Sequence, residues 1–124
     1  MNTIILLAVL AVGANNDRLI QALIQVESGG DCQAVGDSGQ AIGVLQIHPI
    51  MVKEVNRILG KDKYTLNDRY SRAKSIEMCN IYLNRVGGND EKKSRCWNGG
   101  YSGHQKKATE KYWAKVKREL SKNS

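Results

Sequence analysis

Apolar residues recur at helical spacing over most of this chain. Ile20, Leu23 and Ile24 follow the three- and four-residue steps of one helix face, which predicts a helix over about residues 16–27. Similar patterns predict helices over about residues 49–59, 71–86, 90–97 and 106–120. The Gly-rich stretch 28–43 has too little pattern for a regular element, although a short irregular sheet fits residues 31–46. The pattern therefore predicts a mainly α protein.

Gly and Pro residues mark the ends of these helices. Pro49 suits the first turn of the second helix, and Gly60 suits its end. Gly87 and Gly88 end the third helix in the same way. The inward faces are predicted to comprise Ile50, Val55, Ile58 and Leu59 in the second helix, Ala73, Ile76, Tyr82, Leu83 and Val86 in the third, and Tyr112, Val116 and Leu120 in the last.

The amino-terminal residues predict export. The chain has 124 residues, which suits one domain. Residues 1–13 are mostly apolar, too short to span a bilayer and of signal-peptide length, with Ala14 as the first mature residue. We therefore expect a signal peptide over 1–13, a catalytic domain over 14–124, and a periplasmic or extracellular location without a stable membrane span. A buried first helix or an uncleaved anchor is the alternative.

The formal net charge of +7 suggests an anionic partner, such as a wall polymer, an acidic membrane or nucleic acid. A small nucleic-acid-binding protein is therefore one alternative, with a footprint of Lys106, Lys107, Lys111, Lys115, Lys117 and Arg118. The chain has no recognisable nucleic-acid-binding motif, so nucleic acid is not the expected partner. A solvated Lys-rich face is the simpler interpretation of such a run.

The three cysteines and two histidines argue against a metal site, because no Cys-x-x-Cys or His-rich spacing is present. One disulfide and one free thiol among Cys32, Cys79 and Cys96 fit an exported protein, with the pairing left open. No cofactor is implied, and a monomer is expected.

Glu27 is the leading candidate for chemistry. It continues the apolar series of the first helix and comes just before Ser28-Gly29-Gly30. A carboxyl beside apolar side chains and near the negative end of a helix should have a raised pKa, which a general acid working near neutral pH requires. A surface residue before a Gly cap is the alternative.

Three separated segments carry a family resemblance: Glu27-Ser28-Gly29-Gly30, Gly43-Val44-Leu45-Gln46-Ile47 and Cys96-Trp97-Asn98-Gly99-Gly100. In this order they resemble the catalytic domain of lytic transglycosylases, a branch of the lysozyme-like superfamily related to goose-type lysozymes. Tyr112 fits the tyrosine that the family carries in its last helix. The resemblance covers nearly all of the chain from Asn16 onward.

The resemblance implies a lysozyme-like single domain, with helices around a cleft. It implies cleavage of the β-1,4 bond between N-acetylmuramic acid and N-acetylglucosamine in peptidoglycan strands, with Glu27 as acid and base. It also implies substrate-binding roles for Ser28, Gln46, Trp97, Asn98 and Tyr112.

Departures from the family pattern keep two alternatives open. Cys96-Trp97 replaces the family's Ala-Tyr, and His48 occupies a position where goose-type hydrolases carry an Asp. A lysozyme-type hydrolase would need a second carboxylate, for which Asp31 and Asp37 are the nearest candidates in sequence. An inactive wall-binding relative is the other alternative.

Overall fold

The computed structural model describes residues 16–122, which form a mainly α fold with one short sheet. Residues 16–27 are helical. The other regular elements are β1 (Val35–Gly36), β2 (Ala41–Ile42), α2 (Pro49–Leu59), α3 (Arg72–Val86), α4 (Asp90–Gly99) and α5 (Glu110–Lys122), with short 3-10 turns at Asp37–Gly39, Leu66–Tyr70, Gly103–Gln105 and Lys107–Thr109. The predicted helices and the predicted short sheet are confirmed.

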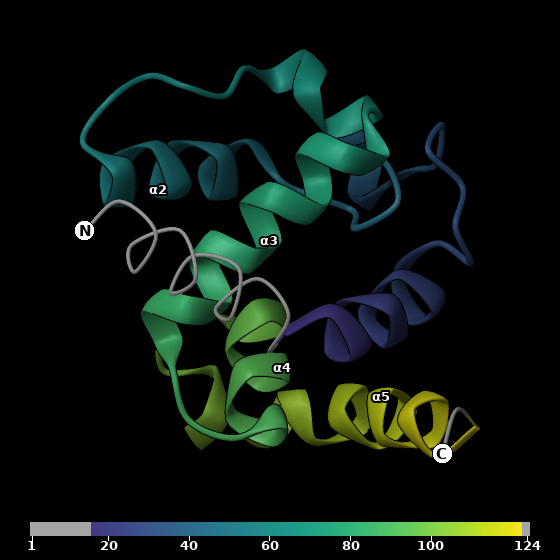
Figure 1. The fold of residues 1–124 in the computed structure, drawn as a ribbon. Coiled ribbons are helices and arrows are strands. Elements are labelled where there is room, and N and C mark those ends of the chain that lie inside the picture. The colour runs from purple at the N-terminus through teal and green to yellow at the C-terminus, as the bar shows by residue number, and fades with distance from the viewer. Residues whose placement is uncertain (1–15, 123–124) are drawn as a thin grey trace, which may run out of the picture.

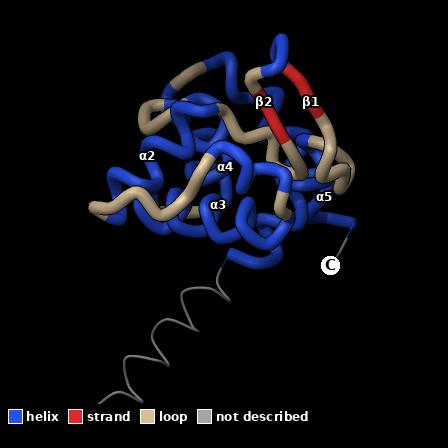
Figure 2. The backbone as a smooth tube through the Cα atoms, turned by 90° about the horizontal axis from the view of Figure 1, so that it is seen from above, coloured by secondary structure: helices blue, strands red, loops and turns tan. Residues whose placement is uncertain are grey.

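Helix α3 forms the centre of the arrangement. It packs against α2 on one side and α4 on the other, and α4 in turn packs against α5 (Figure 1). The antiparallel pair β1–β2 lies at one edge of the molecule (Figure 2). The helix over residues 16–27 contributes Ile20, Leu23 and Ile24 to the central core, together with Tyr82 and Leu83 of α3. One hydrophobic core therefore carries both walls of the site described below.

The helix ends follow the signals seen in the sequence. Pro49 begins α2, and Gly60 closes it in the left-handed conformation at φ 72°. The side chains of Ser71 and Asn89 accept hydrogen bonds from the backbone N–H groups of Lys74 and Lys92, which caps α3 and α4.

Two residues predicted to face inward are exposed. Ile50 is 76% exposed and Ala73 is also exposed, whereas Val52 and Val55 form the buried face of α2. Ile50 lies in the first turn of α2, which extends beyond the core and faces a surface cavity instead. Helical spacing gives the direction of a face, but it does not show where the core ends along the helix axis.

All three cysteines are free in the structure, so the expected disulfide is not formed. Cys79 and Cys96 are buried on α3 and α4, whereas Cys32 lies exposed in the loop after Gly30. The stability of the described domain therefore comes from the helical core.

A buried polar cluster fixes the beginning of the first helix. The side-chain amide of Asn16 donates hydrogen bonds of 2.7 Å to both Asn80 and Asn84 of α3. The side-chain oxygen of Asn16 accepts a hydrogen bond of 3.0 Å from the ammonium group of Lys93 in α4. Asn16 is fully buried, so these bonds satisfy a polar group that would otherwise be costly to bury.

Candidate active site

Glu27 lies at the end of its helix, where the chain turns toward the sheet. The N–H groups of Ser28 and Gly29 still bond to the carbonyl of Ile24, and Gly29 then takes a positive φ of 68°. The Glu27 carboxylate is partly buried, and its Oε2 accepts a hydrogen bond of 2.8 Å from the Tyr112 hydroxyl of α5. The first and last helices therefore meet at this carboxylate.

Burial raises the pKa of Glu27 from 4.5 to about 7, because desolvation disfavours the charged form. Hydrogen bonds from Tyr112 and Trp97 oppose this shift, and the nearby charge of Asp37 adds to it. The raised pKa predicted from the sequence is confirmed, with burial as its main cause. A carboxyl with this pKa holds a transferable proton near neutral pH.

The Glu27 carboxyl opens into a cavity of about 420 Å³. One wall comes from the segment around β2 and the start of α2, and the other comes from the end of α4. The lining residues are Glu27, Asp37, Gln46, Ile47, His48, Ile50, Met51, Trp97, Asn98 and Gly100. Within residues 16–122, no group of three or more His, Cys, Asp or Glu side chains could hold a metal ion.

Gln46 is held at the cavity by its own loop. It has a positive φ of 50°, which is uncommon for a residue other than Gly. Its amide nitrogen donates to the carbonyls of Ala34 at 3.2 Å and Gly43 at 3.1 Å. The buried guanidinium of Arg69 fixes the same loop by donating to the carbonyls of Gln40 and Ile47.

Ser28 connects the end of the helix over residues 16–27 to this loop. Its hydroxyl donates to the carbonyl of Val44 at 2.7 Å and accepts from the backbone N–H groups of Gly30 and Asp31. Ser28 is not among the residues that line the cavity. The structure thus places the Ser28 hydroxyl on backbone groups and not toward the cavity, which differs from the substrate contact that the resemblance implied.

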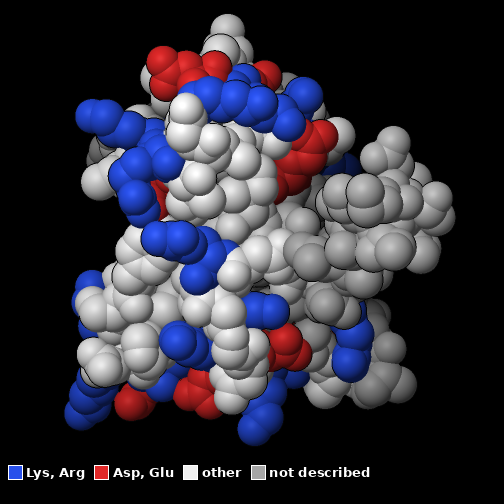
Figure 3. Space-filling model, turned by 60° about the vertical axis from the view of Figure 1, so that its left-hand side comes forward, with Lys and Arg blue, Asp and Glu red and all other residues white. Residues whose placement is uncertain are grey.

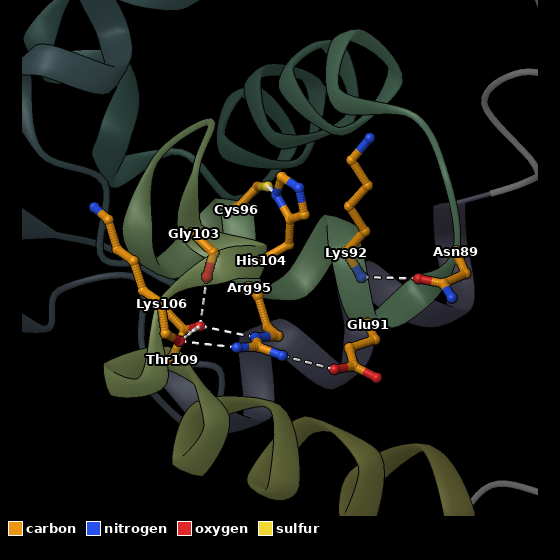
Figure 4. A network of polar contacts seen from close by, with 9 residues as sticks. All are labelled: Asn89, Glu91, Lys92, Arg95, Cys96, Gly103, His104, Lys106 and Thr109. Atoms are coloured by element: carbon orange, nitrogen blue, oxygen red, sulfur yellow. Dashed lines mark hydrogen bonds and ion pairs between the residues drawn. The ribbon is translucent and has the colours of Figure 1, made fainter.

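Trp97 and Asn98 lie near the end of α4. Trp97 is largely buried, and its ring packs edge-on against Tyr82 at 5.8 Å, whereas Asn98 is exposed at the rim. Figure 4 shows the contacts between α4 and the segment after it, residues 103–109. The Arg95 side chain donates to the Thr109 hydroxyl and to the Lys106 carbonyl, each at 2.8 Å, and also pairs with Glu91. This network joins the Trp97 wall of the cavity to the segment that leads into α5.

Asp37 and His48 form a pair on the other wall. His48 Nε2 lies 2.8 Å from Asp37 Oδ2, and both residues line the cavity. Asp37 has a positive φ of 47°, so its backbone is held in a strained conformation beside the site. Asp31 does not line this cavity, and its carboxylate accepts a hydrogen bond from the N–H of Gln33. Of the two candidate second carboxylates, only Asp37 is positioned at the cavity.

The structure therefore brings five of the six predicted site residues to one place: Glu27, Gln46, Trp97 and Asn98 line the cavity, and Tyr112 bonds to Glu27. Ile47, Met51 and Gly100 also line it, although sequence reasoning gave them no role in the site. Ile47 and Gly100 lie within two of the motif segments that carry the resemblance, whereas no signal in the sequence marks Met51, because its exposure to the cavity depends on how the two walls meet.

The amino-acid sequence also matches a known protein family. The sequence pattern of the Transglycosylase SLT domain matches residues 11–120, so the chain belongs to this family of peptidoglycan-acting enzymes. The predicted mainly α, lysozyme-like fold is confirmed with it. Searches of curated proteins and of solved structures found no significant match.

Removing the Tyr112 hydroxyl should shift the pH dependence of activity. The Tyr112 hydrogen bond stabilises the Glu27 carboxylate and lowers its pKa. In Tyr112→Phe we expect the Glu27 pKa to rise further, so the alkaline limb of the pH–rate profile should move to higher pH. The Tyr64→Phe variant is the control, because Tyr64 donates to Glu77 and neither residue lines the cavity. An alkaline limb at the same pH in Tyr112→Phe and in the unmodified protein would show that this hydrogen bond does not change the pKa of Glu27.

Proposed function

We propose that this protein is a lytic transglycosylase that cleaves the β-1,4 bond between N-acetylmuramic acid and N-acetylglucosamine in peptidoglycan. One observation carries the proposal: the protonatable Glu27 carboxyl, with a pKa raised to about 7, opens into a cavity between the two walls of the fold. Membership of the SLT family supports the substrate class. Asn98 supplies a whole amide group at the rim of the cavity for the sugar hydroxyl and acetamido groups, whereas Gln46 offers only its amide oxygen, because its amide nitrogen already donates to the carbonyls of Ala34 and Gly43.

The proposed reaction needs only one carboxyl group. Glu27 donates its proton to the glycosidic oxygen as the bond from that oxygen to C1 breaks, and the substrate's acetamido group stabilises the positive sugar centre. The Glu27 carboxylate then takes the proton of the C6 hydroxyl as this oxygen bonds to C1. The carboxyl is regenerated, and the product carries a 1,6-anhydro end. Tyr112 holds the carboxylate in place between the two steps.

Mass spectrometry of the products tests the proposal. Purified protein is incubated with peptidoglycan, and the masses of the soluble fragments are measured. Transglycosylation gives fragments with anhydro ends, which are lighter by one water than the fragments of hydrolysis. Fragments with reducing ends alone would refute the transglycosylase reaction, and a lack of soluble fragments would refute cleavage altogether.

The Asp37–His48 pair favours hydrolysis as a second candidate. The pair lines the same cavity as Glu27, so a water between them and the sugar would be within reach of a base. In this reaction the water oxygen bonds to C1, His48 takes the water proton, and Glu27 protonates the leaving oxygen. If it occurs, His48→Ala should lower the share of reducing-end fragments and leave the anhydro fragments. An unchanged ratio would exclude this role.

Basic residues cover much of the molecule and suit an anionic wall. Figure 3 shows Lys and Arg side chains over the whole height of one face, with acidic groups interspersed. On α5, Lys111, Lys115, Lys117 and Arg118 are all exposed. Lys106 is engaged differently, because its ammonium donates to the Gly99 carbonyl at 2.7 Å at the end of α4. We infer that the free charges on α5 attract the enzyme to anionic wall polymers.

Lys107 is likewise exposed, in the turn just before α5, so reversing the charges of Lys107 and Lys111 should slow action on whole walls. The effect should be largest at low ionic strength and should fade as the Debye length shortens to about 8 Å. Short, weakly charged glycan fragments serve as the control substrate, since their cleavage at Glu27 should be little affected. Equal losses on both substrates would mean that these lysines act in the fold or the cleft.

We also propose export to the periplasm or the cell exterior, where peptidoglycan lies. The proposed leader, residues 1–13, lies outside the described residues. Within the described part, no helix is both long and apolar enough to cross a bilayer. Amino-terminal sequencing of the exported protein tests the proposal: a sequence that begins at Ala14 supports it, and one that begins at Met1 refutes cleavage.

A further inference from the structure

Tyr101 and Glu54 connect the two walls of the catalytic cavity. Tyr101 follows α4 directly after Gly100, and Glu54 lies in α2. The Tyr101 hydroxyl donates a hydrogen bond to Oε2 of Glu54, and Arg57 donates to Oε1 of the same carboxylate at 2.7 Å. We refer to the hydrogen-bonded pair Tyr101 and Glu54 as the clasp.

The clasp stands at one end of the cavity. Gly100 and Ile50 line the cavity, whereas Tyr101 and Glu54 do not. Tyr101 is the next residue after Gly100, and Glu54 lies about one helical turn after Ile50 in α2. Tyr101 is 45% exposed, and the Glu54 side chain is 22% exposed. A partly exposed bridge between two walls lies at the surface, not beneath the buried floor that Glu27 and Trp97 form.

A second and larger concave surface adjoins the clasp at Glu54. A cavity of about 710 Å³ runs along α2, and its lining includes Glu54, Arg57 and Lys53. Ile50 lines both cavities, so the two meet at this side chain. An unobstructed groove would therefore continue from Glu27 past Ile50 onto the face of α2.

Both ends of the clasp are held by further contacts. The hydrogen bond from Arg57 lowers the pKa of Glu54 to about 2, so Glu54 is a carboxylate that accepts a charge-assisted bond. The Tyr101 ring packs on the Tyr82 ring at 5.1 Å, and Tyr82 packs on Trp97 at the cavity. The clasp is thus part of a preorganised set of contacts that reaches the site itself.

We propose that the Tyr101–Glu54 clasp determines substrate length, because it ends the sugar-binding groove at Gly100 and Ile50. This inference rests on the proposed function, since it concerns the glycan strand that Glu27 would cleave. A strand that fits within the closed cleft binds without a conformational cost. A longer strand must break the clasp, so its apparent affinity is reduced by the fraction of molecules in which the clasp is open.

Binding of peptide-free glycan oligomers of increasing length tests the proposal. Calorimetry in a Glu27→Gln background measures affinity without cleavage. With the clasp intact, affinity should stop rising once an oligomer fills the cleft. Tyr101→Phe, which keeps the ring on Tyr82, and Glu54→Ala should each strengthen the binding of longer oligomers by about tenfold, the effect of losing one charge-assisted hydrogen bond. Together they should add little to either alone, because they remove the same bond.

Tyr64→Phe is the matched control. It removes a tyrosine–carboxylate hydrogen bond of 2.7 Å to Glu77, and neither residue lines the cleft. It should leave the length dependence unchanged. If Tyr101→Phe and Glu54→Ala showed the same dependence of affinity on oligomer length as the protein with the intact clasp, the proposed role of the clasp would be refuted. Binding without release of fragments by the chain that retains Glu27 would instead refute the proposed cleavage, and the binding series would still decide the role of the clasp.

Discussion

Replacing Glu27 by Gln is expected to reduce cleavage by roughly a thousandfold or more, because Gln keeps the shape of the side chain but has no transferable proton. The carbonyl oxygen of the introduced amide would still accept the hydrogen bond from Tyr112 that Glu27 accepts now. The fold should therefore persist, with an unchanged circular-dichroism spectrum. Release of soluble fragments from peptidoglycan is the measurement. A folded variant with near wild-type release would show that Glu27 is not the acid.

The same substitution should raise stability above acidic pH. Glu27 has a raised pKa in the folded state, so the folded protein holds a proton that the unfolded chain releases between pH 4.5 and about 7. Wild-type stability consequently falls as pH rises through this window, whereas the neutral Gln has no such cost. The shift corresponds to about 3 kcal/mol at most. Thermal unfolding should show equal stability of the two proteins at pH 4. At pH 8 the Glu27→Gln variant should be the more stable one.

Gly43→Ala is expected to destabilise the protein by about 4 kcal/mol, which lowers the melting temperature by roughly 10 °C or more. Gly43 has a positive φ of 84°, and an added Cβ would lie 1.9 Å from the carbonyl oxygen of Arg69. This oxygen belongs to the backbone, so it cannot move aside without moving the turn that holds the β2 loop. Gln46 donates to the Gly43 carbonyl, so the variant should also lose activity in the fraction that remains folded.

Gly39→Ala separates the two parts of this effect. Gly39 has a similar positive φ of 92°, but an added Cβ would meet nothing within 4 Å. It should therefore show the backbone strain alone, a cost of about 1 kcal/mol. Equal losses of melting temperature in the two variants would mean that close contact with Arg69 is not what requires Gly at position 43.

The helices and the position of Glu27 could be predicted from the sequence because they depend on local pattern. The spacing of Ile20, Leu23 and Ile24 sets the face of the first helix, and Pro49 and Gly60 set the bounds of α2. The order of the three motifs then indicated which residues meet at the cleft.

Contacts between distant segments could not be predicted in this way. Tyr101 and Glu54 are separated by 47 positions, and no periodicity relates them. The bond between His48 and Asp37 depends on left-handed backbone at Asp37 and Ser38, two residues for which this conformation is uncommon. The exposure of Ile50 has the same origin, because helical spacing does not show that the first turn of α2 borders a cavity.

The buried cluster around Asn16 fixes one end of the first helix, so a change in this cluster would tilt the helix and displace its other end. Asn16 and Glu27 lie at opposite ends of it, roughly 16 Å apart at the rise of an α-helix. A tilt of a few degrees at Asn16 would carry the acid about an ångström from its target, and a misplacement of that size can cost about a hundredfold in rate. Under the proposed function, the position of the Glu27 proton therefore depends on Asn80, Asn84 and Lys93 as well as on Tyr112, although these three side chains hold Asn16 and do not line the cavity.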